Sequence, residues 1–331
     1  MSFASISQPA TPRSRRLVAF LVLAAIAALV VATPFLSNYH IRVVNSLLIY
    51  ILLGIGLNIV IGYTGLLDLG FVAFYAVGAY TYALLASPQL DLHLPFLFIV
   101  GVAAVLGMIT GILLGIPVLK LRGDYLAIVT LGFGEIIRIV VNNVDWLTGG
   151  PKGIARLDKA SIFGVEIARP IEIYWLLLVT VFVVGLFVWR LERSILGKAW
   201  AAIREDQDAA RGIGINTTNA KLAAFSTSAT IGAVAGTIFA ASQRFVSPES
   251  FTLQESVLIV LMIVIGGIGN ILGIVAGAAI LILLPELLRE FAEWRILFLG
   301  ILMVVLIIVR PAGIVPRSFG PEKLIRGLFG K

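Results

Sequence analysis

The chain has 331 residues, of which 60% are hydrophobic and only 13% are charged, and its formal net charge is +7. Soluble domains carry roughly 45–50% apolar and about 25% charged residues, so this composition excludes the usual soluble enzyme folds. The basic residues flank apolar segments and do not line one face of a folded domain, which argues against nucleic-acid binding. Without cysteine, the chain has no disulfide, thiolate metal site or thiol nucleophile.

Long apolar segments follow one another along the chain. A spanning helix needs about 20 apolar residues, and these segments lack the alternation of apolar and polar residues that marks barrel strands. The sequence therefore predicts an all-α polytopic membrane protein with about ten transmembrane or re-entrant helices. The expected segments are 17–36, 43–61, 66–86, 95–119, 125–141, 173–190, 221–241, 255–268, 271–288 and 296–310.

The distribution of lysine and arginine predicts the orientation of these segments. With the N-terminus in the cytoplasm and ten alternating spans, most basic residues lie on the cytoplasmic side, as the positive-inside rule requires. The expected organisation is a cytoplasmic tail over 1–16, a transmembrane domain over 17–310 and a cytoplasmic tail over 311–331. The alternative is eight or nine spans with a re-entrant segment. The first segment could instead be a signal peptide that is cleaved off.

Two hydrophilic loops interrupt the series of apolar segments. The loop over 142–172 is expected outside the cell, and the loop over 190–221 is expected in the cytoplasm. In the second loop, Lys198–Arg211 is rich in alanine and lacks proline and glycine, which predicts one short helix. Gly212 and Gly214 follow it, as glycines do after the end of a helix.

The predicted loop helix is amphipathic, because Trp200, Ile203 and Ala210 fall on one side of it at helical spacing. Such a helix is suited to a groove on a soluble partner protein. The alternative is a helix that lies on lipid headgroups, which is expected to carry a lysine-rich polar face. Acidic and basic residues are nearly balanced here, and this favours a protein partner.

Six motifs resemble one family of transport proteins. Asp208–Gly214 is similar to the Glu-Ala-Ala-x-x-x-Gly loop by which ABC importer permeases contact their ATPase, with Asp208 where the general motif has Glu. Over roughly residues 40–315 the chain resembles the permeases of high-affinity branched-chain amino acid importers, the larger of the two above all. The motifs that carry this resemblance are Gly62–Gly70, Leu121–Tyr125, Gly132–Arg138, Leu147–Gly153, Ala202–Asn216 and Gly266–Asn270.

The resemblance implies a transporter permease and not an enzyme. Branched-chain (hydrophobic) amino acids would cross the cell (inner) membrane through a heterodimer of this chain and a second permease subunit. Two cytoplasmic ABC ATPase subunits would bind ATP-Mg, and an extracytoplasmic amino-acid-binding protein would deliver the substrate. No cofactor is expected on this chain, which lacks a phosphate-loop motif. The expected ATPase-coupling residues are Arg204, Glu205, Asp206, Asp208, Ala209, Ala210 and Gly214.

Three ionisable side chains are expected at membrane depth, where they are costly and are functional candidates by default. Asp68, Glu135 and Arg138, together with Gly266 and Gly267, are therefore candidates for the translocation path or gate. Each has a structural alternative. Glu135 and Arg138 are three residues apart and form a self-neutralising pair in that alternative, Asp68 caps a helix, and the glycines permit close helix packing.

Two glycine-rich segments, Gly62–Gly70 and Gly266–Gly269, are candidate helix breaks. Broken helices expose backbone donors and acceptors, which suit the carboxylate and ammonium of an amino acid. Three other functions stay open from the sequence. They are a related ABC permease for urea or short amides, an ion-coupled secondary transporter, and a membrane enzyme that acts on lipid.

Overall fold

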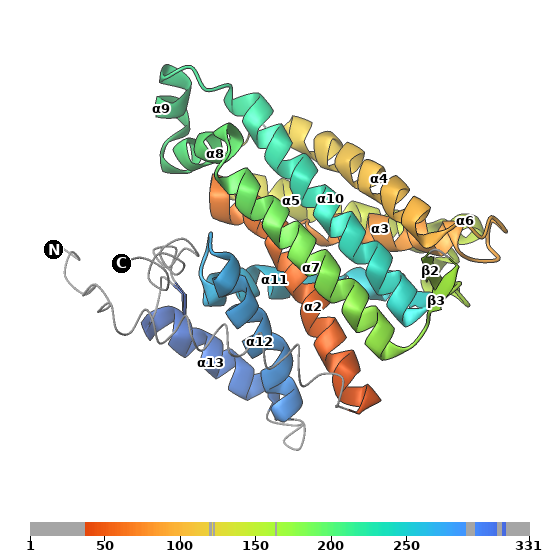
Figure 1. The fold of residues 1–331 in the computed structure, drawn as a ribbon. Coiled ribbons are helices and arrows are strands. Elements are labelled where there is room, and N and C mark those ends of the chain that lie inside the picture. Colours follow the sequence, from red (N-terminus) through yellow and green to blue (C-terminus); the bar gives the residue numbers. More distant parts are fainter. Residues whose placement is uncertain are drawn as a thin grey trace, which may run out of the picture.

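A computed structural model describes residues 37–118, 121, 123–162, 164–288, 295–309 and 313–315. Helices account for most of this part of the chain, which confirms the predicted all-α polytopic fold (Figure 1). The first expected span, 17–36, the tail over 1–16 and most of the tail over 311–331 lie outside the described residues.

The described part of the chain contains nine longer helices, which are joined by shorter helices, short strands and loops. The longer helices are α2 (Asn38–Asn58), α3 (Val72–Leu85), α4 (Phe96–Val118), α5 (Asp124–Asn143), α7 (Pro170–Glu192), α10 (Thr217–Gln243), α11 (Leu253–Gly266), α12 (Ile271–Leu287) and α13 (Arg295–Val309). The shorter ones are α6 (Asp145–Thr148), α8 (Ile195–Glu205), α9 (Gln207–Gly212), the π-helical turn η2 (Ile59–Tyr63) and the 3₁₀ turns η3 (Gly150–Lys152) and η4 (Pro248–Phe251). Every apolar segment predicted from residue 43 onward overlaps one of the longer helices.

The segment expected over 66–86 begins later than predicted. Residues 64–71 form a turn, in which Gly65 has a φ of +73°, and α3 starts only at Val72. The turn is held by Asp68, whose Oδ1 accepts a hydrogen bond from the Gly70 amide at 2.9 Å. An aspartate that bonds the backbone two residues ahead favours a turn over a helix. The apolar pattern alone does not reveal this competition.

Six helices in the described ranges are long and apolar enough to cross a membrane: α2 with η2, α4, α5, α7, α10, and α11 with η4. The apolar helices α3 and α12 have 14 and 17 residues, which is less than the usual length of a span. The ten-span arrangement and its re-entrant alternative therefore both stay as predictions.

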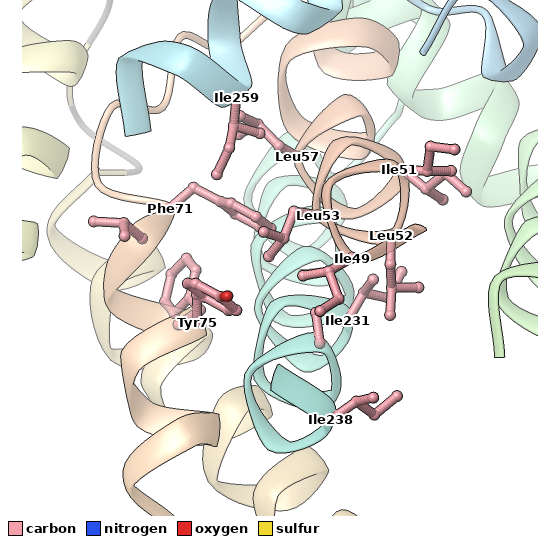
Figure 2. Packing of buried hydrophobic residues seen from close by; sticks show 14 of the residues in the cluster. Ile49, Ile51, Leu52, Leu53, Leu57, Phe71, Tyr75, Ile231, Ile238 and Ile259 are labelled. Carbon is pink, nitrogen blue, oxygen red and sulfur yellow. The ribbon is translucent and has the colours of Figure 1, made fainter. Parts of the chain in front are cut away.

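Helix α2 lies at the centre of the bundle. In its most apolar stretch 89% of the residues are buried within the chain, against 17% for α7. Leu53 of α2, Tyr75 of α3, Ile231 of α10 and Ile259 of α11 belong to the same buried cluster (Figure 2). The apolar outer faces of α4, α5 and α7 remain exposed in the isolated chain, as expected for surfaces that face lipid or a partner.

Glycines allow α3 and α10 to approach each other closely. A Cβ added to Gly78 of α3 would lie 1.8 Å from the carbonyl oxygen of Ala233. A Cβ added to Gly236 of α10 would lie 2.1 Å from the carbonyl oxygen of Tyr75. Small residues at both helices are the usual means of close packing in a membrane.

The loop over 142–172 is ordered by short elements. After α6 and η3, strand β1 (Ile154–Ala155) pairs antiparallel with β4 (Phe245–Val246), and β2 (Ala160–Ile162) pairs with β3 (Val165–Ile167). Asp158 fastens the loop to the segment after α3, because its Oδ2 accepts a hydrogen bond from His93 Nδ1 at 2.6 Å. Hydrogen bonds raise the pKa of His93 above its usual value. The bond to Asp158 has the larger effect and the bond to Asp91 the smaller one.

The two hydrophilic loops lie at opposite ends of α7 and α10, with α8 and α9 at one end and β2 and β3 at the other (Figure 1). The chain has no cysteine, so single cysteines can report the side of each loop. We expect a membrane-impermeant maleimide to label Val165→Cys in intact cells and Ile213→Cys only in opened cells. Both parent side chains are exposed. Labelling of both in intact cells would overturn the predicted orientation.

Candidate functional site

The predicted loop helix over Lys198–Arg211 is two helices, so this prediction was wrong in one respect. Asp206 adopts an extended backbone conformation between α8 and α9. Its Oδ1 accepts hydrogen bonds from the amides of Asp208 and Ala209, at 2.7 and 2.9 Å. Aspartate is among the best residues for capping the start of a helix. Asp206 caps α9, and its extended backbone ends α8.

The apolar side of α8 and α9 packs against this chain and not against a partner. Trp200, Ile203 and Ala210 are buried, as their spacing predicts. The indole Nε1 of Trp200 donates a hydrogen bond to the carbonyl oxygen of Ala220 at 2.7 Å. Its ring stacks on Tyr63, with 6.5 Å between ring centroids and 4° between planes. The expectation that this side enters a partner groove is therefore corrected, because the chain's own bundle covers it.

The outer side of α8 and α9 carries most of the predicted coupling residues. Glu205, Asp206, Asp208, Ala209 and Gly214 are exposed. Near them Ile213 has 75% of its surface exposed. Asp208 forms an exposed ion pair with Arg211 at 3.7 Å, and Gly214 has a φ of +87° with open space around it. This outer side is available to another protein.

Arg204 differs from the other predicted coupling residues, because its side chain points into the bundle. Its Nη1 donates a hydrogen bond to the carbonyl oxygen of Gly62 at 2.5 Å. Gly62 lies in η2, at the C-terminal end of the long α2 helix. Carbonyl groups in the last turn of a helix lack intrahelical partners, and a cation there also interacts favourably with the helix dipole. Arg204 thus caps this helix end.

The two predicted helix breaks meet in the structure. Asn58, the fully buried last residue of α2, accepts a hydrogen bond at Oδ1 from the Gly269 amide at 2.9 Å. A Cβ on Gly62 would lie 2.0 Å from that same Oδ1 and 2.8 Å from the Gly269 nitrogen. Asn58 was not among the residues predicted from the sequence. Its signal is an uncharged polar residue within an apolar segment, which needs a partner inside the bundle.

Backbone carbonyl groups at the break between α11 and α12 are paired with the segment over 313–315. The carbonyl oxygens of Ile265 and Gly266 accept hydrogen bonds from the amides of Ile314 and Val315, both at 2.9 Å. These helix-end carbonyls are therefore not open to a substrate ammonium group in this conformation. A Cβ on Gly266 would also lie 2.0 Å from the carbonyl oxygen of Gly273, so Gly266 permits close packing of α11 and α12.

Asp68 is buried in the turn before α3 and is not the cap of that helix, since Phe71 precedes α3 without a side-chain cap. Within the described residues, its Oδ2 has no hydrogen-bond partner. The adjacent Leu69 amide donates to Thr130 Oγ1 at 3.0 Å, which ties this turn to α5. Asp68 does not contact the Glu135–Arg138 pair in any hydrogen bond or ion pair that the described part of the chain shows.

Glu135 and Arg138 form an ion pair on α5. Arg138 Nε donates to Glu135 Oε1 at 3.0 Å and to Oε2 at 3.1 Å. The side chains are 39% and 33% exposed, among exposed apolar residues such as Ile136 and Ile139. The pair thus lies on the outer apolar face of a candidate span and not in the core of the isolated chain.

Removing one member of this pair is expected to be worse than removing both. Glu135→Gln or Arg138→Gln alone leaves a single charge on an apolar helix face, whereas the double variant leaves none. We expect the amount of permease in the membrane to fall more in each single variant than in the double variant, as quantitative immunoblotting can measure. Unchanged amounts in all three variants together with reduced uptake would instead indicate direct contact with substrate.

No cluster of three or more His, Cys, Asp or Glu side chains that suits a metal ion occurs among the residues described. Two features stand out at this end of the bundle: the exposed side of α8 and α9, and the two helix breaks that meet through Asn58, Gly62 and Gly269. A polytopic helical bundle of this kind, with an exposed pair of short helices at one end, is typical of a membrane transport permease.

Residues 39–309 match the family described as branched-chain amino acid transport system / permease component, and the chain belongs to this family. The high-affinity branched-chain amino acid transport system permease proteins LivM of Salmonella typhimurium and Escherichia coli are similar to it. Each is 43% identical, covering 93% of this chain and 77% of the relative. An autoinducer 2 import system permease protein LsrC of Escherichia coli is 27% identical, covering 61% of this chain and 60% of the relative. No solved structure matches.

Family membership decides among the functions that the sequence left open. The chain is a permease component of an ABC transport system and not an enzyme. It therefore works with other subunits of that system. An ion-coupled secondary transporter and an enzyme that acts on lipid do not fit this family.

Proposed function

We propose that this chain forms one half of a heterodimeric pore that carries branched-chain amino acids across the cell (inner) membrane. The second half is another permease subunit, and an extracytoplasmic amino-acid-binding protein delivers the substrate. The identity of 43% to two branched-chain amino acid permeases, against 27% to an autoinducer 2 permease, supports this substrate class. In this arrangement both termini and the α8–α9 end face the cytoplasm.

The exposed side of α8 and α9 is the observation that carries the proposal. Two ABC ATPase subunits bind ATP-Mg and hydrolyse it, and one of them docks on this exposed side. Glu205 and Asp208 supply negative charge there, and Ile213 supplies an apolar contact. Small docking surfaces that combine an apolar anchor with charged neighbours are typical of specific protein contacts. This chain itself binds no ATP.

The outer face of α5 borders the translocation path in this proposal. A half-exposed ion pair is a poor fit to hydrocarbon, because charged groups in a membrane normally face protein or a water-filled cavity. Covering Glu135 and Arg138 by the second permease subunit, or by water in the path between the subunits, removes this conflict. Asp68, Gly266 and Gly267 are placed further inside and act on the path through the packing of the helix breaks.

Co-purification tests the proposed assembly and its substrate. The tagged chain is isolated from its native membrane in mild detergent, and the proteins that accompany it are identified by mass spectrometry. The expected companions are a second permease and an ABC ATPase. The binding protein encoded with them is expected to bind leucine, isoleucine or valine in calorimetry. A binding protein that takes urea, a short amide or a sugar-like ligand would overturn the substrate class but not the assembly.

A further inference from the structure

A continuous series of contacts connects α8 to both helix breaks. Arg204 of α8 donates its hydrogen bond to the Gly62 carbonyl oxygen in η2 at 2.5 Å. Gly62 packs directly against the Asn58 side chain, and Asn58 accepts the hydrogen bond of the Gly269 amide in the second break. Three contacts therefore lead from the surface helix to the segment between α11 and α12.

The first contact is rigidly held. Trp200 of α8 is buried, and its ring stacks on Tyr63, which is the last residue of η2. Gly65 has a φ of +73°, and a Cβ there would lie 2.9 Å from Arg204 Cγ. The Arg204 side chain thus lies against the chain immediately after η2. A displacement of α8 cannot leave η2 in place without breaking both the stacking and the Arg204 hydrogen bond.

The second contact joins two segments with unusual backbones. A π-helical turn such as η2 is uncommon and is often found at functional sites. In the second break Gly267 and Gly269 have φ values of +129° and +83°. Asn58 is the buried side chain that connects the two, and its Nδ2 has no hydrogen-bond partner within the described ranges. A buried polar group with unused hydrogen-bonding capacity can exchange partners when the segments shift.

We propose that Arg204 and Asn58 are positioning residues that transmit movement of α8 to the helix break at Gly266–Gly269. The inference rests on the proposed function, since it takes the ATPase subunits as the source of that movement. When α8 moves, the hydrogen bond of Arg204 to Gly62 displaces the end of α2. The hydrogen bond between Asn58 and Gly269 then displaces the second break. Neither residue needs to touch the substrate. Packed side chains and hydrogen bonds between rigid helices are the physical means of such coupling.

The experiment uses the complete complex of both permeases and both ATPases, reconstituted with its binding protein. Uptake of labelled leucine and ATP hydrolysis are measured per assembled complex, for Arg204→Met and Asn58→Leu. We expect uptake per ATP hydrolysed to fall by about 2- to 30-fold, the range that residues in coupling networks produce. Arg204→Lys keeps a cationic donor and is expected to retain more coupling than Arg204→Met. The double variant is expected to be little worse than the stronger single variant, because both act in one path.

Asn45→Leu is the matched control. Asn45 is also a buried asparagine of α2, and its Nδ2 donates to the Pro170 carbonyl oxygen at 2.9 Å, away from both breaks. We expect this variant to keep its uptake per ATP. Equal losses in Asn45→Leu and Asn58→Leu would overturn the inference, since any buried asparagine would then have the same effect. Arg204→Met and Asn58→Leu break different contacts. If only one of these variants accumulates in the membrane, that variant is sufficient for the test.

Hydrogen exchange at the break distinguishes transmission from a merely structural role. Amide exchange in residues 266–270 is followed by mass spectrometry with and without a non-hydrolysable ATP analogue. The unaltered complex is expected to change its exchange there when the analogue binds, and Arg204→Met is expected to lose this change. A response that persists in Arg204→Met, or that is missing from an unaltered complex that still transports, overturns the inference alone. Absence of ATP-dependent uptake in the unaltered complex would overturn the proposed function instead.

Discussion

Gly78→Ala is expected to remove most of the permease from the membrane. The added Cβ would lie 1.8 Å from the carbonyl oxygen of Ala233, a backbone atom that cannot move unless α10 moves with it. Overpacking a core typically costs about 1–3 kcal/mol, and a clash between two backbones lies at the upper end of this range or above it. Quantitative immunoblotting of membranes and thermal unfolding of the detergent-solubilised protein measure the loss.

Gly185→Ala is the control for this substitution. Gly185 also lies within an apolar helix, α7, but no atom lies within 4 Å of a Cβ placed there. Alanine has the higher helix propensity, so we expect this variant to accumulate as well as the unaltered chain. Equal accumulation of Gly78→Ala and Gly185→Ala would contradict the close approach of α3 and α10.

Reversing the charge of Glu205 and Asp208 is expected to abolish ATP-driven uptake without loss of permease from the membrane. Both side chains are exposed, so the exchange for lysine does not disturb the packing of α8 and α9. The exchange at Asp208 removes an exposed ion pair with Arg211, and such pairs contribute little to stability. Like charges brought together at an interface cost several kcal/mol, which corresponds to more than about a hundredfold loss of affinity for the ATPase.

Co-purification of the ATPase and labelled leucine uptake are both measured for this double variant. Glu166→Lys is the control, because Glu166 is exposed on β3 at the opposite end of the bundle. It removes an exposed pair with Lys159 and is expected to leave ATPase binding intact. If the double variant retains the ATPase and transports normally, the ATPase does not dock on the exposed side of α8 and α9.

The positions of the helices followed from the sequence, because long apolar segments have few other structures open to them in a membrane. The pairing of Glu135 with Arg138 also followed from local spacing, since residues three apart share a helix face. Boundaries were less certain where a side chain competes for backbone groups. Asp206 bonds to the amides that follow it and ends α8, which helix propensity alone would continue. Asp68 bonds to the Gly70 amide in a turn that delays the start of α3.

Contacts between distant segments did not follow from the sequence. The amphipathic pattern of Trp200 and Ile203 identified a side that must be buried, but not the surface that buries it. Asn58 and Gly269 are 211 positions apart, and no local pattern encodes their hydrogen bond. The same applies to Gly62, which the glycine-rich motif marked as a helix break without indicating its neighbour. Such pairings are set by the packing of the whole bundle.

These contacts relate the architecture to transport. The exposed side of α8 and α9 is the proposed ATPase site, and the buried side fastens the same helices to the end of the central α2 helix. Under the proposed function, movement of α8 and α9 would act on α2, the helix that lies deepest in the bundle. The proposed function needs such a connection, because it assigns ATP hydrolysis to a subunit other than the one that lines the path.

Uptake into proteoliposomes tests the central claim most directly. The two permeases and the ATPases are reconstituted, ATP is supplied on the α8–α9 side, and the binding protein with labelled leucine is supplied on the other. We predict that leucine accumulates when ATP is present, and that it does not when a non-hydrolysable analogue replaces ATP. Ionophores that collapse ion gradients are predicted to have no effect. Accumulation that needs an ion gradient and not ATP would contradict the account.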